Sequence, residues 1–148
     1  MTPVSVFLST AMDGIPRSRI EHLFQWVENE LERIGFVLSN PLREAPEFAL
    51  QQPPQDAEER HIVQHDLDKL KLSDLCLVDM SLSGHVYIGC ICEIVYAHQW
   101  HKPIVVCIGD NDLENRMWLK YHTTYICRDF DAAFAFLRAR AAANRPGG

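Results

Sequence analysis

The chain has 148 residues, about the length of one domain. Hydrophobic residues make up 47% of it and charged residues 23%, a mixture typical of globular proteins that excludes the disordered and fibrous classes. Acidic residues outnumber lysine plus arginine by 20 to 14, giving a formal net charge of −6. Because a nucleic acid polymer calls for a basic surface, this balance argues against DNA or RNA as the main partner. A small phosphate compound remains compatible, since it needs only one local cluster of donors.

The sequence favours a cytoplasmic protein without a membrane partner. Its apolar runs are far shorter than the roughly 18 residues of a membrane span. The first residues, Met1 to Leu8, lack a signal peptide's basic start and cleavage site. Four of the five cysteines lie in apolar segments, as thiols do in a reducing compartment.

Strand and helix patterns alternate along the chain. Strands are predicted over 4–9, 36–38, 75–80, 103–108 and 124–127, and helices over 17–34, 56–72, 89–100, 112–119 and 129–143. In the first helix, an apolar stripe predicts a buried side, and Glu21, Glu28 and Glu32 are expected on the opposite, solvent side. Residues 40–56 contain four prolines and are predicted to form a loop or lid, and residues 144–148 a flexible tail.

This alternation predicts a single α/β domain over residues 1–148, doubly wound and flavodoxin- or Rossmann-like. Five parallel strands, with helices on both faces, would have the common order 2-1-3-4-5. In that order the chain reverses between strands 1 and 3, and ligands bind at the carboxyl ends of the strands around the reversal. The segments after Leu8 and Val78 are therefore where we expect a site.

Three acidic residues lie where apolar residues would be expected. Asp66 shares a helix face with Ile62, Val63 and Leu70. A carboxylate on a buried stripe costs free energy unless it has a partner. A structural alternative is pairing with a nearby lysine at the helix edge.

Asp79 and Glu93 complete this set. Asp79 ends the apolar strand Leu75 to Val78, where ligand-facing groups occur in parallel sheets, although it could equally form the turn of the loop 81–84. Glu93 lies in the first turns of an almost wholly apolar helix. The helix dipole alone could account for it, but its apolar surroundings favour a nucleophile or base. Acids converging on one cleft without a metal pattern suggest glycosidic-bond chemistry.

The same residues carry a family resemblance. Asp66, the pair Ser73-Asp74, Asp79, the run Gly89-x-x-x-Glu93 and Tyr96-Ala97 before Lys102-Pro103 together resemble the nucleoside 2-deoxyribosyltransferase family, as does the opening Val6-Phe7-Leu8-Ser9-Thr10-Ala11-Met12. The resemblance spans roughly residues 4 to 108. The superfamily includes N-glycosidases that act on nucleoside monophosphates.

The resemblance implies roles for particular residues. Glu93 would be the nucleophile of a glycosyl-enzyme intermediate, Asp66 would orient the sugar or help protonate the base, and Asp79 could support it. The loop from Ser9 to Arg19 looks like the segment that contacts base and phosphate, which makes Ser9, Thr10, Met12, Gly14, Arg17 and Arg19 candidate binding residues. A 5′-phosphate would lie against Ser81, Ser83 and the backbone at Gly89.

Two positions depart from the family pattern. Val95 replaces the glycine that usually follows the nucleophile in Glu-x-Gly-Tyr-Ala, and we expect it to crowd the helix against the sheet. Tyr87 stands where a phosphate-binding serine is expected.

Other chemistries remain as alternatives. A metal could be bound among His85, Cys90, Cys92, His98 and His101, but only His98 and His101 have the spacing of a helical ligand pair. Cys90 or Cys92 beside His85 could serve as a nucleophile, although both cysteines suit small core positions. Trp100, Trp118, Tyr121 and Tyr125 could stack on a base, or belong to core or interface. We predict no metal and no cofactor.

The sequence thus predicts an enzyme that releases the free base from a nucleoside 5′-monophosphate. A nucleoside 2-deoxyribosyltransferase that exchanges bases is the first alternative, and a nucleotide-sensing module without turnover is the second. The partner would be a small nucleoside or nucleotide. A homo-oligomer, a dimer or larger, is expected, with the apolar helix 89–100 as a possible contact surface.

Overall fold

The computed structural model describes residues 2–44 and 58–144. The predicted loop over 40–56 lies outside the described residues from residue 45 on, and so does the predicted tail from residue 145 on. The strands are β1 (Val4–Thr10), β2 (Phe36–Ser39), β3 (Leu75–Asp79), β4 (Ile104–Cys107) and β5 (Tyr125–Cys127). The helices are α1 (Arg17–Arg33), α2 (Pro41–Glu44), α4 (Glu58–Leu72), α5 (Ile88–Gln99), α6 (Met117–His122) and α7 (Phe130–Ala143).

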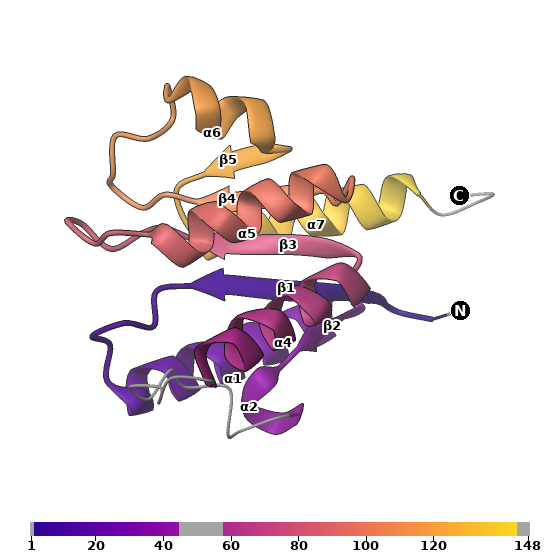
Figure 1. Ribbon diagram of the computed structural model, residues 1–148. Coiled ribbons are helices and arrows are strands. Elements are labelled where there is room, and N and C mark those ends of the chain that lie inside the picture. The colour runs from indigo at the N-terminus through magenta and orange to yellow at the C-terminus, as the bar shows by residue number, and fades with distance from the viewer. Residues whose placement is uncertain (1, 45–57, 145–148) are drawn as a thin grey trace.

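The five strands form one parallel sheet in the order β2-β1-β3-β4-β5, which confirms the predicted fold class and strand order (Figure 1). Helices α1 and α7 pack on one face, and α4 and α5 pack on the other. The chain reverses between β1 and β3, which are direct neighbours. The carboxyl ends of these two strands therefore form the predicted switch point.

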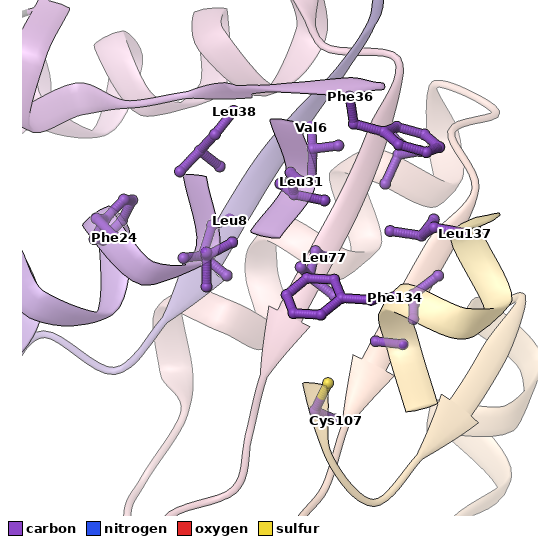
Figure 2. Close-up of a cluster of buried hydrophobic side chains, with 14 of the residues drawn as sticks. Val6, Leu8, Phe24, Leu31, Phe36, Leu38, Leu77, Cys107, Phe134 and Leu137 are labelled. Atoms are coloured by element: carbon purple, nitrogen blue, oxygen red, sulfur yellow. The ribbon is translucent and has the colours of Figure 1, made fainter. Parts of the chain in front are cut away.

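Side-chain alternation divides each central strand between two cores. Val6, Leu8 and Leu77 point toward α1 and α7, where they meet Phe24, Leu31, Phe134 and Leu137 (Figure 2). Phe7, Cys76 and Val78 point the other way, toward α4 and α5. The position of a residue in this alternation decides which face of the sheet it serves.

The short helix near the end of the chain begins later than predicted. It covers Met117–His122 rather than 112–119. The guanidinium of Arg128 donates to the backbone carbonyls of Gly109 and Asn111 and to a carboxylate oxygen of Glu114 (2.6 Å). These contacts hold the segment before α6 in turns. The spacing of apolar residues over 112–119, which predicted a helix, therefore results from packing in the first part of this range.

Glu28 does not lie on the solvent side of α1, contrary to the prediction. Its side chain is only 4% exposed and accepts hydrogen bonds from Asn40 (3.2 Å) and from Arg43. Because both partners follow β2, the carboxylate ties the start of the loop after β2 to α1. A buried charge with a charged partner is tolerated where an isolated one is not.

No helix in the described ranges is both long enough and apolar enough to span a membrane.

Candidate active site

A pocket opens at the carboxyl end of β1, beside the start of α5. Residues from β1, α4, the loop before α5 and α5 itself line it. Among the predicted site residues, those that line it are Ser9, Thr10, Met12, Asp66, Gly89 and Glu93. The structure therefore brings two of the three acids, Asp66 and Glu93, together with four of the nine predicted substrate-binding residues.

Glu93 faces this pocket from the inner side of α5. It follows the buried Cys90 by one helical turn, and the Ser9 hydroxyl donates a hydrogen bond to its Oε1 (3.0 Å). A Cβ added to Gly89 would stand 4.0 Å from the same oxygen, so the carboxylate lies against the first turn of the helix. Burial and, to a smaller extent, the neighbouring Asp66 raise the pKa of Glu93 to about 8, although the hydrogen bond from Ser9 acts in the opposite direction.

Asp66 reaches the pocket from α4, between the buried Ile62 and Leu70. Burial raises its pKa to about 6, and the nearby His65 acts in the opposite direction. Since the two acids also repel each other, protons leave the pair in two steps. Between about pH 6 and pH 8 the pair holds one proton, so one carboxyl is ionised while the other is neutral.

The N-terminus of α5 forms another wall of the pocket. Its N-cap residue Tyr87 provides no side-chain cap, and the first turn holds no acidic residue. The first amide groups of a helix lack carbonyl partners within it and attract anions. Lys69 and His85 line the same pocket and add potential positive charge. This end of the pocket suits an anionic group.

Asp79 lies on the opposite face of the sheet. It alternates in step with Leu75 and Leu77, which point toward α1 and α7. Its carboxylate accepts hydrogen bonds from the Thr10 hydroxyl (3.3 Å) and from the backbone amide (3.1 Å) and hydroxyl of Ser81. These are the contacts expected if Asp79 forms the turn of the loop 81–84, which was the alternative to a ligand-facing role.

The other predicted residues lie outside the Glu93 pocket. Arg19 and Ser81 line a separate cavity with Asp79 and Trp26, between β1 and α1. Arg17 forms an ion pair with Glu21 on the surface of α1 (2.7 Å). Gly14 and Ser83 lie in exposed loops. Their predicted roles in binding stay predictions.

The two departures from the family pattern have structural explanations. The expectation that Val95 crowds the helix against the sheet is wrong, because its side chain points outward and is 40% exposed. Tyr87 is buried, and its hydroxyl accepts a hydrogen bond from the Leu82 amide (2.7 Å). The tyrosine therefore braces the loop before α5.

The geometry gives little support to the cysteine and metal alternatives. Burial raises the pKa of Cys90 to about 12, so at neutral pH it is a thiol rather than a nucleophilic thiolate. Cys92 is exposed on the outer side of α5. Within residues 2–44 and 58–144, no group of three potential ligands is arranged to hold a metal ion.

Lys69 and His85 were not assigned to a substrate pocket from the sequence, although both of them line this one. Lys69 follows Asp66 by three positions, so the helical spacing that singled out the acid could also have placed the lysine beside it. His85 belongs to an irregular loop, and no periodic pattern points to it.

No protein-family model and no curated protein sequence matches the chain. Solved structures do share its fold. A 2-deoxyribosyltransferase from Bacillus psychrosaccharolyticus matches with a TM-score of 0.67 and 14% identity, over 88% of this chain and 90% of that one. A 2-deoxyribosyltransferase from Leishmania mexicana gives 0.66 and 16%, over 93% and 98%. The CMP N-glycosidase BcmB from Clostridium botulinum gives 0.54 and 20%, over 92% and 98%.

At these identities the likeness shows a common fold. It agrees with the resemblance found in the sequence, since the solved structures that share the fold include 2-deoxyribosyltransferases and a nucleotide N-glycosidase.

Proposed function

We propose that this chain is an enzyme of the nucleoside 2-deoxyribosyltransferase family that cleaves the N-glycosidic bond of a nucleoside 5′-monophosphate. The observation that carries the proposal is the pair Glu93 and Asp66, which share one pocket and have pKa values raised to about 8 and about 6. Two carboxyls that hold one proton between them can supply a nucleophile and an acid at the same time.

The chemistry follows from this division of roles. Because the pKa of Glu93 is the higher of the two, the shared proton lies mainly on Glu93 near pH 7, and the reactive form is the one in which this proton has moved to Asp66. In that form the ionised carboxylate of Glu93 attacks C1′ of the sugar, the bond to the base breaks with its electron pair, and the base nitrogen takes the proton from Asp66. The products of this step are the free base and a sugar ester on Glu93. Water then attacks C1′ and gives a proton to Asp66, which releases the sugar phosphate and restores the Glu93 carboxylate.

The anionic end of the pocket supports a monophosphate as substrate. The uncapped first turn of α5, together with Lys69 and His85, offers amide donors and positive charge on the side of the pocket next to Glu93. A nucleoside without phosphate would leave these groups to water. BcmB, a CMP N-glycosidase, shares the fold and provides a precedent for this substrate class.

Base exchange is the second candidate. Two of the solved structures that share the fold are 2-deoxyribosyltransferases. In that reaction a second base, rather than water, would resolve the ester on Glu93. Both reactions use the same first step, so the same carboxyl pair serves either.

The test compares wild-type protein with Glu93→Gln. Ribo- and deoxyribonucleoside 5′-monophosphates, including CMP, and the matching nucleosides are incubated with and without an added base, and free base is measured by chromatography. Wild-type protein is expected to release base from monophosphates without an acceptor. Glu93→Gln should lower that rate by about 1,000-fold or more, as removal of a nucleophile does, while calorimetry shows that it still binds the substrate.

Glu32→Gln provides the matched control, because it makes the same chemical change at an exposed position of α1. It should leave base release unchanged. Exchange that requires an added base would establish the transferase instead. Undiminished base release by Glu93→Gln would contradict the mechanism, and binding without turnover by wild-type protein would favour the sensing module.

The cytoplasmic location stays a prediction.

A further inference from the structure

A second cavity lies behind the Glu93 pocket, on the α1 side of the sheet. Its volume is about 400 Å³, which is within the range of sites that bind small molecules. Residues from the carboxyl ends of β1 and β3, from the first half of α1 and from the start of α7 line it. Thr10 and Ala11 line both hollows, so the two cavities lie back to back at the end of β1.

The α1 side of this second cavity carries basic groups. Arg19 and His22 are three positions apart, so they lie on one side of the helix, and both line the cavity. In the described part of the chain, no carboxylate forms an ion pair with Arg19, whereas Arg17 is paired with Glu21. A guanidinium with no partner can bind an anionic group through two parallel N–H groups. This side of the cavity therefore suits an acid.

The walls of the second cavity are apolar and partly aromatic. Trp26 is 37% exposed, and its ring packs edge-on against Phe130, with 5.4 Å between the ring centroids. Ile15, Leu23 and Leu82 complete these walls. Because its neighbour already holds the tryptophan ring, a planar ligand could pack on it at little further cost in side-chain entropy. The walls therefore favour a flat aromatic ring.

The sheet side of the cavity provides a hydrogen-bond acceptor. Asp79 is 9% exposed, and its carboxylate accepts hydrogen bonds from Thr10 and from the amide and hydroxyl of Ser81. These donors fix the carboxylate in place and leave it able to accept one more hydrogen bond. A second acid would be repelled here, whereas a ring N–H would be bound. The two sides of the cavity thus have opposite preferences.

We propose that this cavity is a second ligand site and that it binds a planar heteroaromatic acid. The acid group pairs with Arg19, the ring packs on Trp26, and a ring N–H donates to Asp79. Arg19, which the family resemblance assigned to substrate binding, serves a different ligand in this arrangement. The inference does not depend on the proposed reaction, because the cavity lies on the other side of the sheet from Glu93.

The test uses indole-3-acetate as the probe, because it combines a planar ring, a ring N–H and a carboxylate. Indole-3-acetamide is the matched neutral compound, and tryptamine is the matched cationic one. Each is titrated into ¹⁵N-labelled protein while NMR follows two signals. The side-chain N–H of Trp26, identified by its loss in Trp26→Phe, reports on the second cavity, and the backbone amide of Gly89 reports on the Glu93 pocket.

Indole-3-acetate should move the Trp26 signal and leave that of Gly89 in place. A Kd of about 0.1–1 mM is expected for a ligand with so few atoms. Indole-3-acetamide and tryptamine should bind at least about tenfold more weakly, because neither offers a carboxylate to Arg19.

Arg19→Gln removes the basic group at an exposed position of α1 and should weaken the binding of indole-3-acetate about tenfold. Arg33→Gln is the matched control, because it makes the same change near the other end of the same helix, at a side chain that is 73% exposed and outside the cavity. It should bind the probe as wild-type protein does. Circular dichroism confirms that each variant is folded.

A Trp26 shift that is selective for the acid and is weakened in Arg19→Gln alone would support the proposal. No shift of the Trp26 signal at about 10 mM probe would overturn it. So would equal affinity for the three compounds, a shift of the Gly89 signal alone, undiminished binding by Arg19→Gln, or an equal loss in Arg33→Gln.

Discussion

Ser9 lowers the pKa of Glu93, against the larger effects of burial and of Asp66. It is 2% exposed and alternates in step with Phe7, so its hydroxyl points toward α5 and donates to Glu93 Oε1 (3.0 Å). A hydrogen bond to the ionised carboxylate lowers its pKa and opposes the effect of burial. In the proposed reaction, Ser9 would favour the arrangement in which Glu93 is ionised and Asp66 keeps the proton.

Ser9→Ala should therefore change the pH profile of base release. For wild-type protein we expect activity to rise through about pH 6, as the pair loses its first proton, and to fall through about pH 8, as it loses the second. Without the serine the ionised form of Glu93 is less stable, so the alkaline limb should move upward and the maximal rate should fall about tenfold or more.

Two variants complete this measurement. Ser9→Thr restores a hydroxyl and should recover most of the rate, whereas Ser18→Ala, at an exposed position of α1, should change nothing. A lower rate with both limbs unmoved would assign Ser9 a role in packing only.

Individual acids were singled out in the sequence because their neighbours are apolar. An acid with apolar neighbours can face a pocket, but it can also form a turn on the other face of the sheet. Asp66 and Glu93 do share a pocket, as helical spacing suggested. Asp79 ends the same strand as Val78 but points to the opposite face, and the alternation of Leu75, Leu77 and Asp79 could have shown this. The burial of Glu28 was not predictable from the sequence, because its partner Arg43 comes from another element.

Among the elements, regular alternation was predictable and irregular segments were not. The strand order was predicted as the common one for five-stranded parallel sheets of this kind, and the structure has that order. The start of α6 was misplaced because the contacts that set it come from Arg128, on the far side of β5. Such long-range hydrogen bonds leave no local signal.

The contact between the segments after β3 and after β4 depends on Gly109. Its φ is +58°, and a Cβ there would stand 2.9 Å from the carbonyl oxygen of Ser81. Gly109→Ala should therefore lower the free energy of unfolding through both backbone strain and a steric clash, by about 2–4 kcal/mol. Gly35→Ala is the matched control, with φ +85° and no atom within 4 Å of the added Cβ, and should lose only about 1–2 kcal/mol.

Urea unfolding measures both values. Equal losses for the two glycines would mean that the segment around Ser81 moves aside without cost, and that the close approach does not fix its position.

For the whole molecule, the acid surplus has two different consequences. Exposed acids such as Glu21 and Glu32 contribute to the net charge of −6. Glu93 instead couples the folding equilibrium to pH, because its pKa rises from 4.5 to about 8 when the chain folds. The folded chain therefore holds a proton that the unfolded chain has already released between these two values.

Glu93→Gln should accordingly stabilise the fold, and more so at high pH. In wild-type protein the favourable contribution of the protonated carboxyl is fully present below about pH 4.5 and is lost as the pH rises to about 8. The amide of glutamine never ionises, so the difference in stability should grow across this window to a few kcal/mol, or roughly 5–10 °C in Tm, and stay level above it. Thermal melts of wild-type protein, Glu93→Gln and the exposed Glu32→Gln between pH 5 and pH 9 measure it. Parallel curves for Glu93→Gln and wild-type protein would show that folding does not raise the pKa of Glu93, and would remove the basis for its role in a shared-proton pair.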